Sequence, residues 1–230
     1  MMKTLIFTAI AAATLGLAST TVAAYETGDL VVRGGFTQVA PQGDSGKIYT
    51  GYDNLGTTAL EVGVDNDTQL GLNLVYFYTP RVAVELLAAT PFSHDMNVEN
   101  NNLAPTVSDG SLGESKQLPP TLSVLYYFGA TDAALQPYAG LGVNYTVFFD
   151  ESFTAEREDE GFSDLKLDNS FGLAVQAGFD YQLDKHWMIN GSVRYIDIDT
   201  TANFKLGGEN SHVDVDIDPI VSSLMVGYRF

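Results

Sequence analysis

One segment, residues 171–183, restricts the fold more than any other part of the chain. Its sequence is FGLAVQAGFDYQL, in which every odd-numbered position is apolar or aromatic. The even-numbered positions are small or polar, and they include Gln176, Asp180 and Gln182. Alternation with a period of two predicts a β-strand with one apolar and one polar face. The fold then depends on which of these two faces meets water.

The same alternation recurs along most of the chain. We predict strands at about 28–40, 67–79, 82–92, 119–129, 137–149, 171–183, 187–199 and 216–230. Short connections at 79–81, 129–136 and 184–186 separate long polar loops at 41–66, 93–118, 150–169 and 200–215. An even number of strands, with short turns at one end and long loops at the other, is typical of an outer-membrane barrel.

The first 24 residues have the organisation of a secretory signal peptide. Lys3 precedes an apolar run at 5–18, and small residues at 22–24 form a plausible cleavage site. The run is shorter than the roughly 20 residues of a membrane helix, which disfavours an N-terminal anchor. We therefore expect a signal peptide at 1–24 and one mature domain at 25–230 that begins with Tyr25.

Composition excludes several classes of protein. A net charge of −18 makes nucleic acid a poor partner, because phosphate binding needs a basic surface. The chain has no Cys, which excludes a disulfide scaffold and a thiolate metal site. No segment after residue 24 is long and apolar enough to be a membrane helix. Export then leaves the periplasm, the exterior or the outer membrane.

A closed barrel in lipid reconciles the two faces of the strands. The apolar face is too continuous to be left in water, and the opposite face is too polar for a sandwich core. Soluble eight-stranded barrels put their apolar phase inside, and period alone does not exclude them. Aromatic residues near the strand ends favour the membrane: Tyr76, Tyr78, Tyr126, Tyr181 and Trp187. We predict an all-β, eight-stranded antiparallel transmembrane β-barrel in the outer membrane of a Gram-negative bacterium.

The inward phase of the predicted barrel mixes apolar and charged residues. Eight strands enclose a space that side chains fill or that holds one small ligand. The predicted apolar lining is Phe77, Leu125, Tyr127 and Phe148. The inward charged residues are Arg33, Glu85, Asp180 and Arg229. We expect them to pair as a structural plug near the periplasmic end, because an unpaired enclosed charge is costly. Such a plug could also force a solute to leave sideways.

Three prolines suggest where a sideways exit would lie. Pro91 falls late in one predicted strand, and Pro119 and Pro120 open the next one. Because proline has no backbone N–H, both partners of one ladder would lack donors at a similar height. The sequence therefore predicts a weak lateral seam here, with ordinary strand ends as the alternative.

Other polar groups give weaker indications. The EREDE run at 156–160 and the alternating Asp214, Asp216 and Asp218 could bind calcium or bridge to lipopolysaccharide through cations. Their spacing matches no specific calcium loop, so a solvated acidic surface is favoured. His94, His186 and His212 lie far apart, and no motif joins them to a nucleophile. We predict no metal, no cofactor and no enzymatic activity.

Long segments of the chain resemble the OmpW family of small outer-membrane proteins. They include YETGDLVVRGG (25–35), VAVELLAATPFSH (82–94), PYAGLGVNYTVFFD (137–150) and YIDIDTTANFKLGG (195–208). The resemblance implies an eight-stranded barrel around a narrow hydrophobic channel for small apolar molecules, and the family includes alkane-uptake proteins of the AlkL type. Some members serve as bacteriocin receptors or respond to stress.

The resemblance also implies particular residue roles. The channel constriction of the family corresponds to Leu87 and Arg194, and the charge at Arg194 departs from a strictly hydrophobic gate. Apart from the family, an aromatic C-terminal residue on an alternating strand, here Phe230, resembles the signal read by the barrel-assembly machinery. The alternative is an ordinary final strand with an aromatic end.

We therefore expect a monomeric barrel in contact with outer-membrane lipid and lipopolysaccharide. It would pass small hydrophobic solutes by diffusion, with lateral release into the bilayer as one exit route. The alternative is a structural or stress-response barrel, or a bacteriocin or phage receptor, without transport; the same fold would serve both.

Overall fold

The computed structural model describes residues 25–42, 45–50, 61–99, 110–130 and 133–230, so the predicted signal peptide lies outside the described residues. This described part of the chain is almost entirely β-strand, with one short helix, α1 (Ala155–Asp159). Within these ranges, no helix is both long and apolar enough to cross a membrane.

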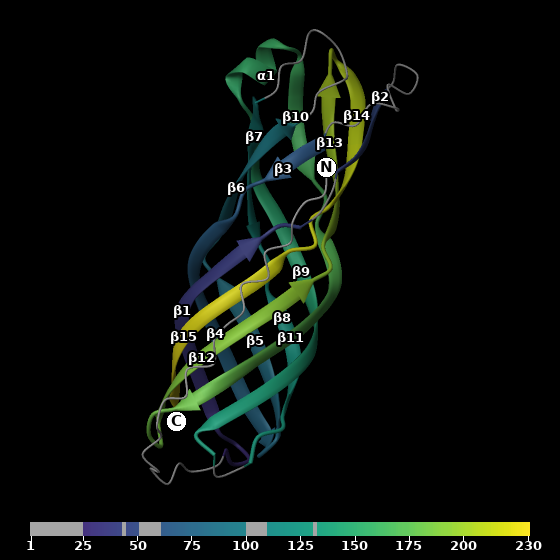
Figure 1. Cartoon of the computed structure of the whole chain (residues 1–230). Helices are drawn as coiled ribbons and strands as arrows, with labels where there is room; N and C mark the ends of the chain where they lie inside the picture. The colour runs from purple at the N-terminus through teal and green to yellow at the C-terminus, as the bar shows by residue number, and fades with distance from the viewer. Residues whose placement is uncertain (1–24, 43–44, 51–60, 100–109, 131–132) are drawn as a thin grey trace, which may run out of the picture.

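Eight strands form a closed antiparallel barrel (Figure 1). In spatial order they are β11 (Ser170–Gln182), β12 (Trp187–Ile196), β15 (Ile220–Arg229), β1 (Leu30–Ala40), β4 (Asp67–Thr79), β5 (Val82–Ala89), β8 (Thr121–Tyr127) and β9 (Leu135–Phe153). The ring closes because β9 also pairs with β11, from Ser170↔Thr146 to Tyr181↔Leu135. Every barrel strand thus has a partner on both sides, and the predicted eight-stranded antiparallel barrel is confirmed.

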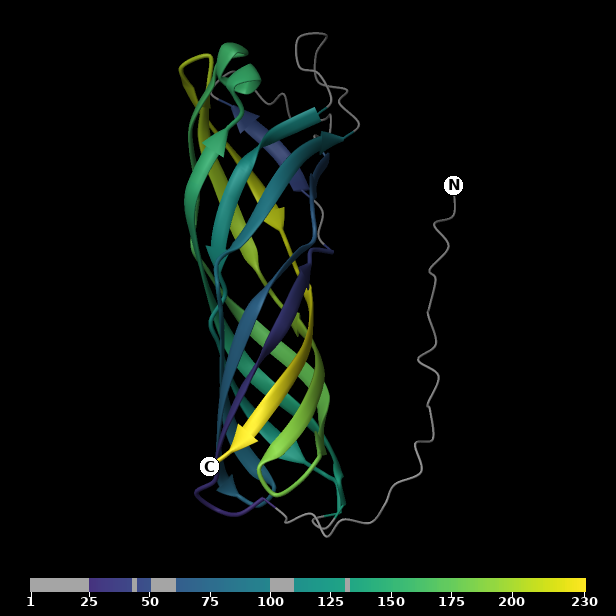
Figure 2. The ribbon, with the colours of Figure 1, turned by 90° about the vertical axis from the view of Figure 1, so that its left-hand side faces the viewer.

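The four long connections are not the loops that the sequence predicted. They contain β2 (Ser45–Thr50), β3 (Glu61–Val64), β6 (Phe92–Glu99), β7 (Gly110–Leu118), β10 (Phe162–Leu167), β13 (Asp199–Leu206) and β14 (Glu209–Asp216). The strands β3, β6 and β7 continue the barrel sheet along β9, and β10, β13, β14 and β2 form a second sheet. Figure 2 shows these strands extending the wall well beyond the barrel.

The loop predictions failed for a physical reason. Beyond the bilayer the outward phase of a strand no longer needs to be apolar, so the contrast between the faces is weak in the sequence. In β6, Phe92 and His94 point inward and are buried, whereas Ser93 and Asp95 are exposed. The last barrel strand also begins at Ile220 rather than near 216, and Asp216 ends β14 instead.

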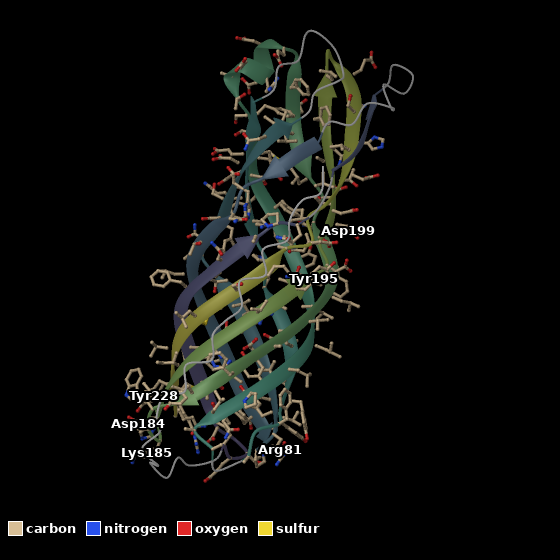
Figure 3. All side chains as sticks on the ribbon, viewed as in Figure 1. Arg81, Asp184, Lys185, Tyr195, Asp199 and Tyr228 are labelled. Carbon is tan, nitrogen blue, oxygen red and sulfur yellow. The ribbon has the colours of Figure 1, made fainter. Side chains whose placement is uncertain are left out.

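The apolar phase of the barrel faces outward and the mixed phase faces inward. In β4 the exposed positions include Leu70, Leu72 and Leu74, and the buried ones include Asn73 and Phe77. Figure 3 places Tyr228 near the end with the short turns and Tyr195 farther along the wall, with Asp199 just beyond it. An apolar belt between aromatic rims suits a bilayer, because a closed barrel satisfies its backbone groups internally.

Candidate functional site

The lumen changes character in three steps along the barrel. Starting from the end with the short turns, it contains an aromatic base, then a network of charged side chains, then an apolar upper part.

The aromatic base closes the end with the short turns. The Tyr25 ring stacks on Phe77, with 3.9 Å between ring centroids, and Tyr127 packs edge-on against Tyr25 at 5.3 Å. Leu125, Phe77 and Tyr127 are at most 1% exposed and belong to the same cluster. These three residues, predicted to line a channel, are buried together with Tyr25 in one apolar cluster at this end of the barrel.

Three ion pairs lie directly above this base. Arg33 contacts Glu85 at 3.0 Å and Asp180 at 2.7 Å, and Arg194 contacts Glu85 at 2.6 Å. All four side chains are at most 2% exposed. We call Arg33, Glu85, Asp180 and Arg194 the ion network. Its two guanidinium groups and two carboxylates balance in charge, as enclosed ions require.

Neutral side chains complete the coordination of both carboxylates. Asn73 and Gln176 donate to Glu85 at 3.0 Å and 2.9 Å. Asp180 accepts hydrogen bonds from Tyr25 at 2.7 Å and from Asn190 at 2.9 Å, as well as from Tyr127. Charge-assisted hydrogen bonds of this kind are the stronger ones in proteins. The network therefore forms a rigid polar layer across the lumen.

Arg229, which the sequence grouped with the plug, lies on the other side of the base. It forms an ion pair with Asp29 at 2.8 Å, and its guanidinium carbon lies 5.7 Å from the centroid of the Tyr25 ring. The Arg229 charge therefore lies at the end with the short turns, whereas Arg194 belongs to the ion network.

The two residues expected at the constriction lie at neighbouring levels. Leu87 is 3% exposed and is the next inward position of β5 after Glu85, toward the long strands. The Arg194 guanidinium is already engaged, because it also donates to Gln176 at 2.6 Å. Leu87 therefore lies where the polar layer gives way to the apolar upper lumen.

The upper lumen holds a packed cluster of buried apolar side chains from six strands and their connections. The cluster consists of Val39, Phe92, Phe148, Ala174, Ile196, Ile198, Ile217 and Val221. Phe148 is the one member of the predicted lining found here. A cavity of about 50 Å³ adjoins this cluster, and Phe148 and Ile217 belong to its wall.

A break in strand pairing lies beside the upper lumen. The β5–β8 ladder ends at Leu87↔Thr121, and the β6–β7 ladder begins at Phe92↔Gln117. In the described part of the chain, residues 88–91 have no register partner among 118–120. Each side is still tied to its other neighbour, through Leu72↔Ala88 on β4 and Leu118↔Val147 on β9.

All three predicted seam residues lie in this break. Pro91 follows the end of β5, which stops at Ala89, so it is not part of that strand as predicted. Pro119 and Pro120 connect β7 to β8. The Pro119 carbonyl accepts hydrogen bonds from the side chains of Thr121 and Asn144, both at 3.1 Å. These donors belong to β8 and β9, so the hydrogen bonds do not cross the break.

Acidic residues gather where the barrel meets the outer strands. Carboxylate oxygens of Asp197, Asp199 and Asp218 lie within 4.8 Å of one another. Burial and the charges of Asp197, Asp216 and Asp218 raise the pKa of Asp199. Asp214 instead accepts a hydrogen bond from Thr201 at 2.9 Å. Residues 156–159 of the EREDE run belong to α1, and Arg157 pairs with Glu160, which follows the helix, at 2.7 Å.

The histidines occupy separate regions. His94 lies on β6 and borders the cavity. His186 lies in a short turn, with Nδ1 3.0 Å from the Arg229 carbonyl oxygen. His212 lies on β14.

Comparison with known proteins agrees with this architecture. The model of the OmpW family matches residues 26–230. The chain belongs to the OmpW family. It is 45% identical over 214 residues to outer membrane protein W of Vibrio cholerae, covering 93% of this chain and 94% of that one. It is 29% identical over 211 residues to outer membrane protein AlkL of Ectopseudomonas oleovorans, covering 90% of this chain and 85% of that one.

A solved family structure has the same fold. The crystal structure of OprG from Pseudomonas aeruginosa superposes with a TM-score of 0.83 at 45% identity, covering 91% of this chain and 99% of that one. This OmpW-family chain is therefore an outer-membrane β-barrel of a Gram-negative bacterium, and its apolar belt contacts lipid.

Several residues of the site were not singled out from the sequence. Tyr25 was expected only as the first mature residue, and Asn73 and Gln176 only as polar inward positions. The inward phase of the strands was the available signal for all but Tyr25. The cavity walls formed by His94 and Gln117 fell in a segment predicted to be a loop.

Proposed function

We propose that this protein is a conduit through which small hydrophobic molecules diffuse into the outer membrane, entering the upper lumen and leaving sideways. The observation that carries the proposal is the position of the unpaired break at residues 88–91 and 118–120, beside an apolar lumen that ends on the ion network.

The ion network supports a lateral exit over a straight one. An apolar molecule that continued along the axis would have to separate Arg194 from Glu85 and then pass the packed ring of Phe77. Breaking a buried ion pair costs roughly 3–5 kcal/mol, because it leaves an uncompensated charge. Leaving through the break disturbs no register pair. The constriction at Leu87 then acts as the floor of the route.

The remaining features of the proposal follow from the same architecture. The barrel works as a monomer and has no enzymatic activity. Lipopolysaccharide is its neighbour in the outer leaflet. Phe230, which is 70% exposed and whose backbone N–H donates to the Leu30 carbonyl at 2.9 Å, is the segment that the barrel-assembly machinery reads.

A disulfide across the break tests the lateral route. Ala88 and Pro120 both face outward on opposite sides of the break, so Ala88→Cys with Pro120→Cys would seal it. Leu86→Cys with Leu122→Cys is the matched control, because this pair is already in register two residues away. The chain has no native Cys to interfere.

Cells lacking the protein would be complemented with each variant, and entry of a long-chain alkane would be measured before and after reduction. We expect entry to stop in the oxidised Ala88–Pro120 variant, to return on reduction and to be unaffected in the control. Undiminished entry in the oxidised variant would exclude the lateral route.

A second test addresses transport itself. Leu87→Asp adds a charge to the floor of the apolar lumen, and Leu87→Met keeps it apolar. At equal levels of folded barrel, we expect alkane entry to fall to background with Leu87→Asp and to persist with Leu87→Met. If cells with wild-type protein admit alkane no faster than cells without it, the structural or receptor role replaces transport.

A further inference from the structure

The lipid-facing wall of the barrel contains a hollow near the end with the short turns. Its volume is about 420 Å³, and its surface is almost entirely apolar. It lies over β8 and β9 and reaches β5 on one side and β11 on the other, all neighbours in the ring. The outward side chains around it are Val82, Val124, Tyr126, Ala139, Leu141 and Val175.

The hollow opens toward the membrane and not toward the lumen. The inward residues that also border it are buried: Leu125, Gly140 and Gln176. The outward Tyr126 and Leu141, by contrast, are 50% and 68% exposed. Ala139 is paired in register with Tyr126, and its short side chain leaves space beside the larger ring. Within the lipid-facing belt this space belongs to hydrocarbon, because an empty hollow would forfeit van der Waals contacts.

One cation lies at the edge of the hollow. Arg81 directly precedes Val82, and its carbonyl accepts a hydrogen bond from the Tyr127 N–H at 2.8 Å, which fixes its backbone beside β8. Figure 3 shows Arg81 at the end with the short turns. Arg81 is exposed, and its guanidinium forms no ion pair with any residue that the structure describes. An unpaired cation at the edge of an apolar hollow complements an anionic amphiphile.

Aromatic side chains show which level of the bilayer this is. Tyr126 and Phe128 are both about half exposed on the outer face, with 6.4 Å between their ring centroids. Aromatic rings of this kind gather at the membrane–water interface. The short turns of outer-membrane barrels face the periplasm. The hollow therefore runs from the head-group level of the inner leaflet, at Arg81, into the hydrocarbon, at Leu141.

We propose that the hollow and Arg81 bind one phospholipid of the inner leaflet that carries a net negative charge. An acyl chain fills the hollow beside Ala139, and the phosphate group pairs with the Arg81 guanidinium, whose planar donors suit phosphate oxygens. The site lies on the outer face of the barrel and is independent of the conduit through the lumen.

The charge of Arg81 distinguishes between head groups. A phosphatidylglycerol head has a single negative charge, which balances the guanidinium. A phosphatidylethanolamine head carries its own ammonium group, which offsets its phosphate and is repelled by Arg81. Lipopolysaccharide lies in the opposite leaflet, away from the short turns.

Native mass spectrometry of the full barrel tests the proposal. The barrel would be released from micelles that hold equal amounts of phosphatidylglycerol and phosphatidylethanolamine with the same acyl chains, and the retained lipids would be counted. Arg81→Gln removes the charge, and Ala139→Leu fills the hollow. The matched controls are Lys185→Gln, another exposed cation in a short turn, and Ser222→Leu, which adds a leucine to the outer face of β15.

We expect wild-type protein and both controls to retain phosphatidylglycerol over phosphatidylethanolamine by about fivefold, the effect of one basic side chain at a membrane surface. Arg81→Gln should retain the two lipids equally, and Ala139→Leu should lose the retained lipid of both kinds. Both substitutions lie outside the ion network, and if one variant does not fold, the other still carries the test.

Equal retention of the two lipids by wild-type protein would overturn the proposal. A preference that survives Arg81→Gln, or a retained lipid that survives Ala139→Leu, would do the same. A wild-type dimer that disappears in Ala139→Leu would assign the hollow to a second copy of the chain instead of a lipid.

Discussion

Arg194 and Glu85 join opposite walls of the barrel, with 2.6 Å between Arg194 Nη2 and Glu85 Oε1. Their strands, β12 and β5, are four places apart in the closed ring of eight. The other carboxylate oxygen of Glu85 holds Arg33 at 3.0 Å. Glu85 is thus shared between two guanidinium groups, which makes it the central residue of the ion network.

The variant Glu85→Gln should destabilise the barrel because it leaves the network with one uncompensated positive charge. We expect a loss of about 3 kcal/mol in the free energy of unfolding, typical of breaking a buried pair. The measurement is urea-induced unfolding of the protein in lipid vesicles.

The double variant Glu85→Gln with Arg194→Gln provides the control for that experiment. It restores charge balance, since Arg33 keeps Asp180 at 2.7 Å, and it should be more stable than Glu85→Gln alone. Strictly additive losses from the two substitutions would contradict a coupled network.

Tyr25 should contribute to stability through its hydroxyl as well as its ring. Tyr25→Phe removes the donor to Asp180 and should cost about 2 kcal/mol, as for a hydrogen bond to a charged group. Tyr25→Ala also removes the ring stacked on Phe77 and should cost about 4 kcal/mol. Tyr78→Phe is the control, since Tyr78 is 70% exposed on the outer face and should change nothing measurable in the same unfolding assay.

His94 should titrate below its ordinary range. Burial lowers the pKa of His94 from 6.5. The hydrogen bond to the Asp65 backbone and the charges of Asp65, Asp67 and Asp95 raise this pKa, but burial has the larger effect. An NMR titration in micelles, with His94→Gln to assign the signal, should give a midpoint below 6.5; a midpoint at or above 6.5 would contradict burial as the dominant cause.

The same shift sets a direction for stability. Because the unfolded chain binds a proton at His94 more readily than the folded one, stability is complete above pH 6.5 and falls as the pH drops through the folded pKa. Amide hydrogen exchange in β6 and β7 should therefore accelerate below pH 6.5 in wild-type protein. In His94→Gln this acceleration should be absent.

The barrel itself could be predicted because lipid imposes a strong alternation on each strand. Leu173 and Val175 on one face and Gln176 on the other already define which side is lipid and which is lumen. The strands beyond the bilayer were missed because their outward side chains, such as Ser93 and Asp95, differ little in polarity from inward ones such as His94.

The site was predictable only as a set of inward residues. Alternation places Arg33, Glu85 and Asp180 inside, and the cost of isolated charge makes their pairing expected. Which charges meet depends on how strands far apart in sequence face each other across the ring. That geometry places Arg194 in the ion network and Arg229 beside Asp29, and no local pattern distinguishes the two arginines.

Depth in the bilayer should determine the cost of a charge on the outer face. Leu141 and Tyr145 lie on the same face of β9, and both are exposed. The Tyr145 hydroxyl accepts a hydrogen bond from Asn169 at 3.3 Å, which places it at the polar rim, whereas Leu141 lies four residues deeper.

Leu141→Arg should destabilise the barrel by about 2–4 kcal/mol. Tyr145→Arg should cost less than about 1 kcal/mol in addition to the loss of the tyrosine ring. Unfolding in vesicles would measure both, with Leu141→Ala and Tyr145→Ala to subtract the loss of each side chain. Equal corrected costs at the two positions would mean that the apolar belt is centred elsewhere than between Tyr228 and Tyr195.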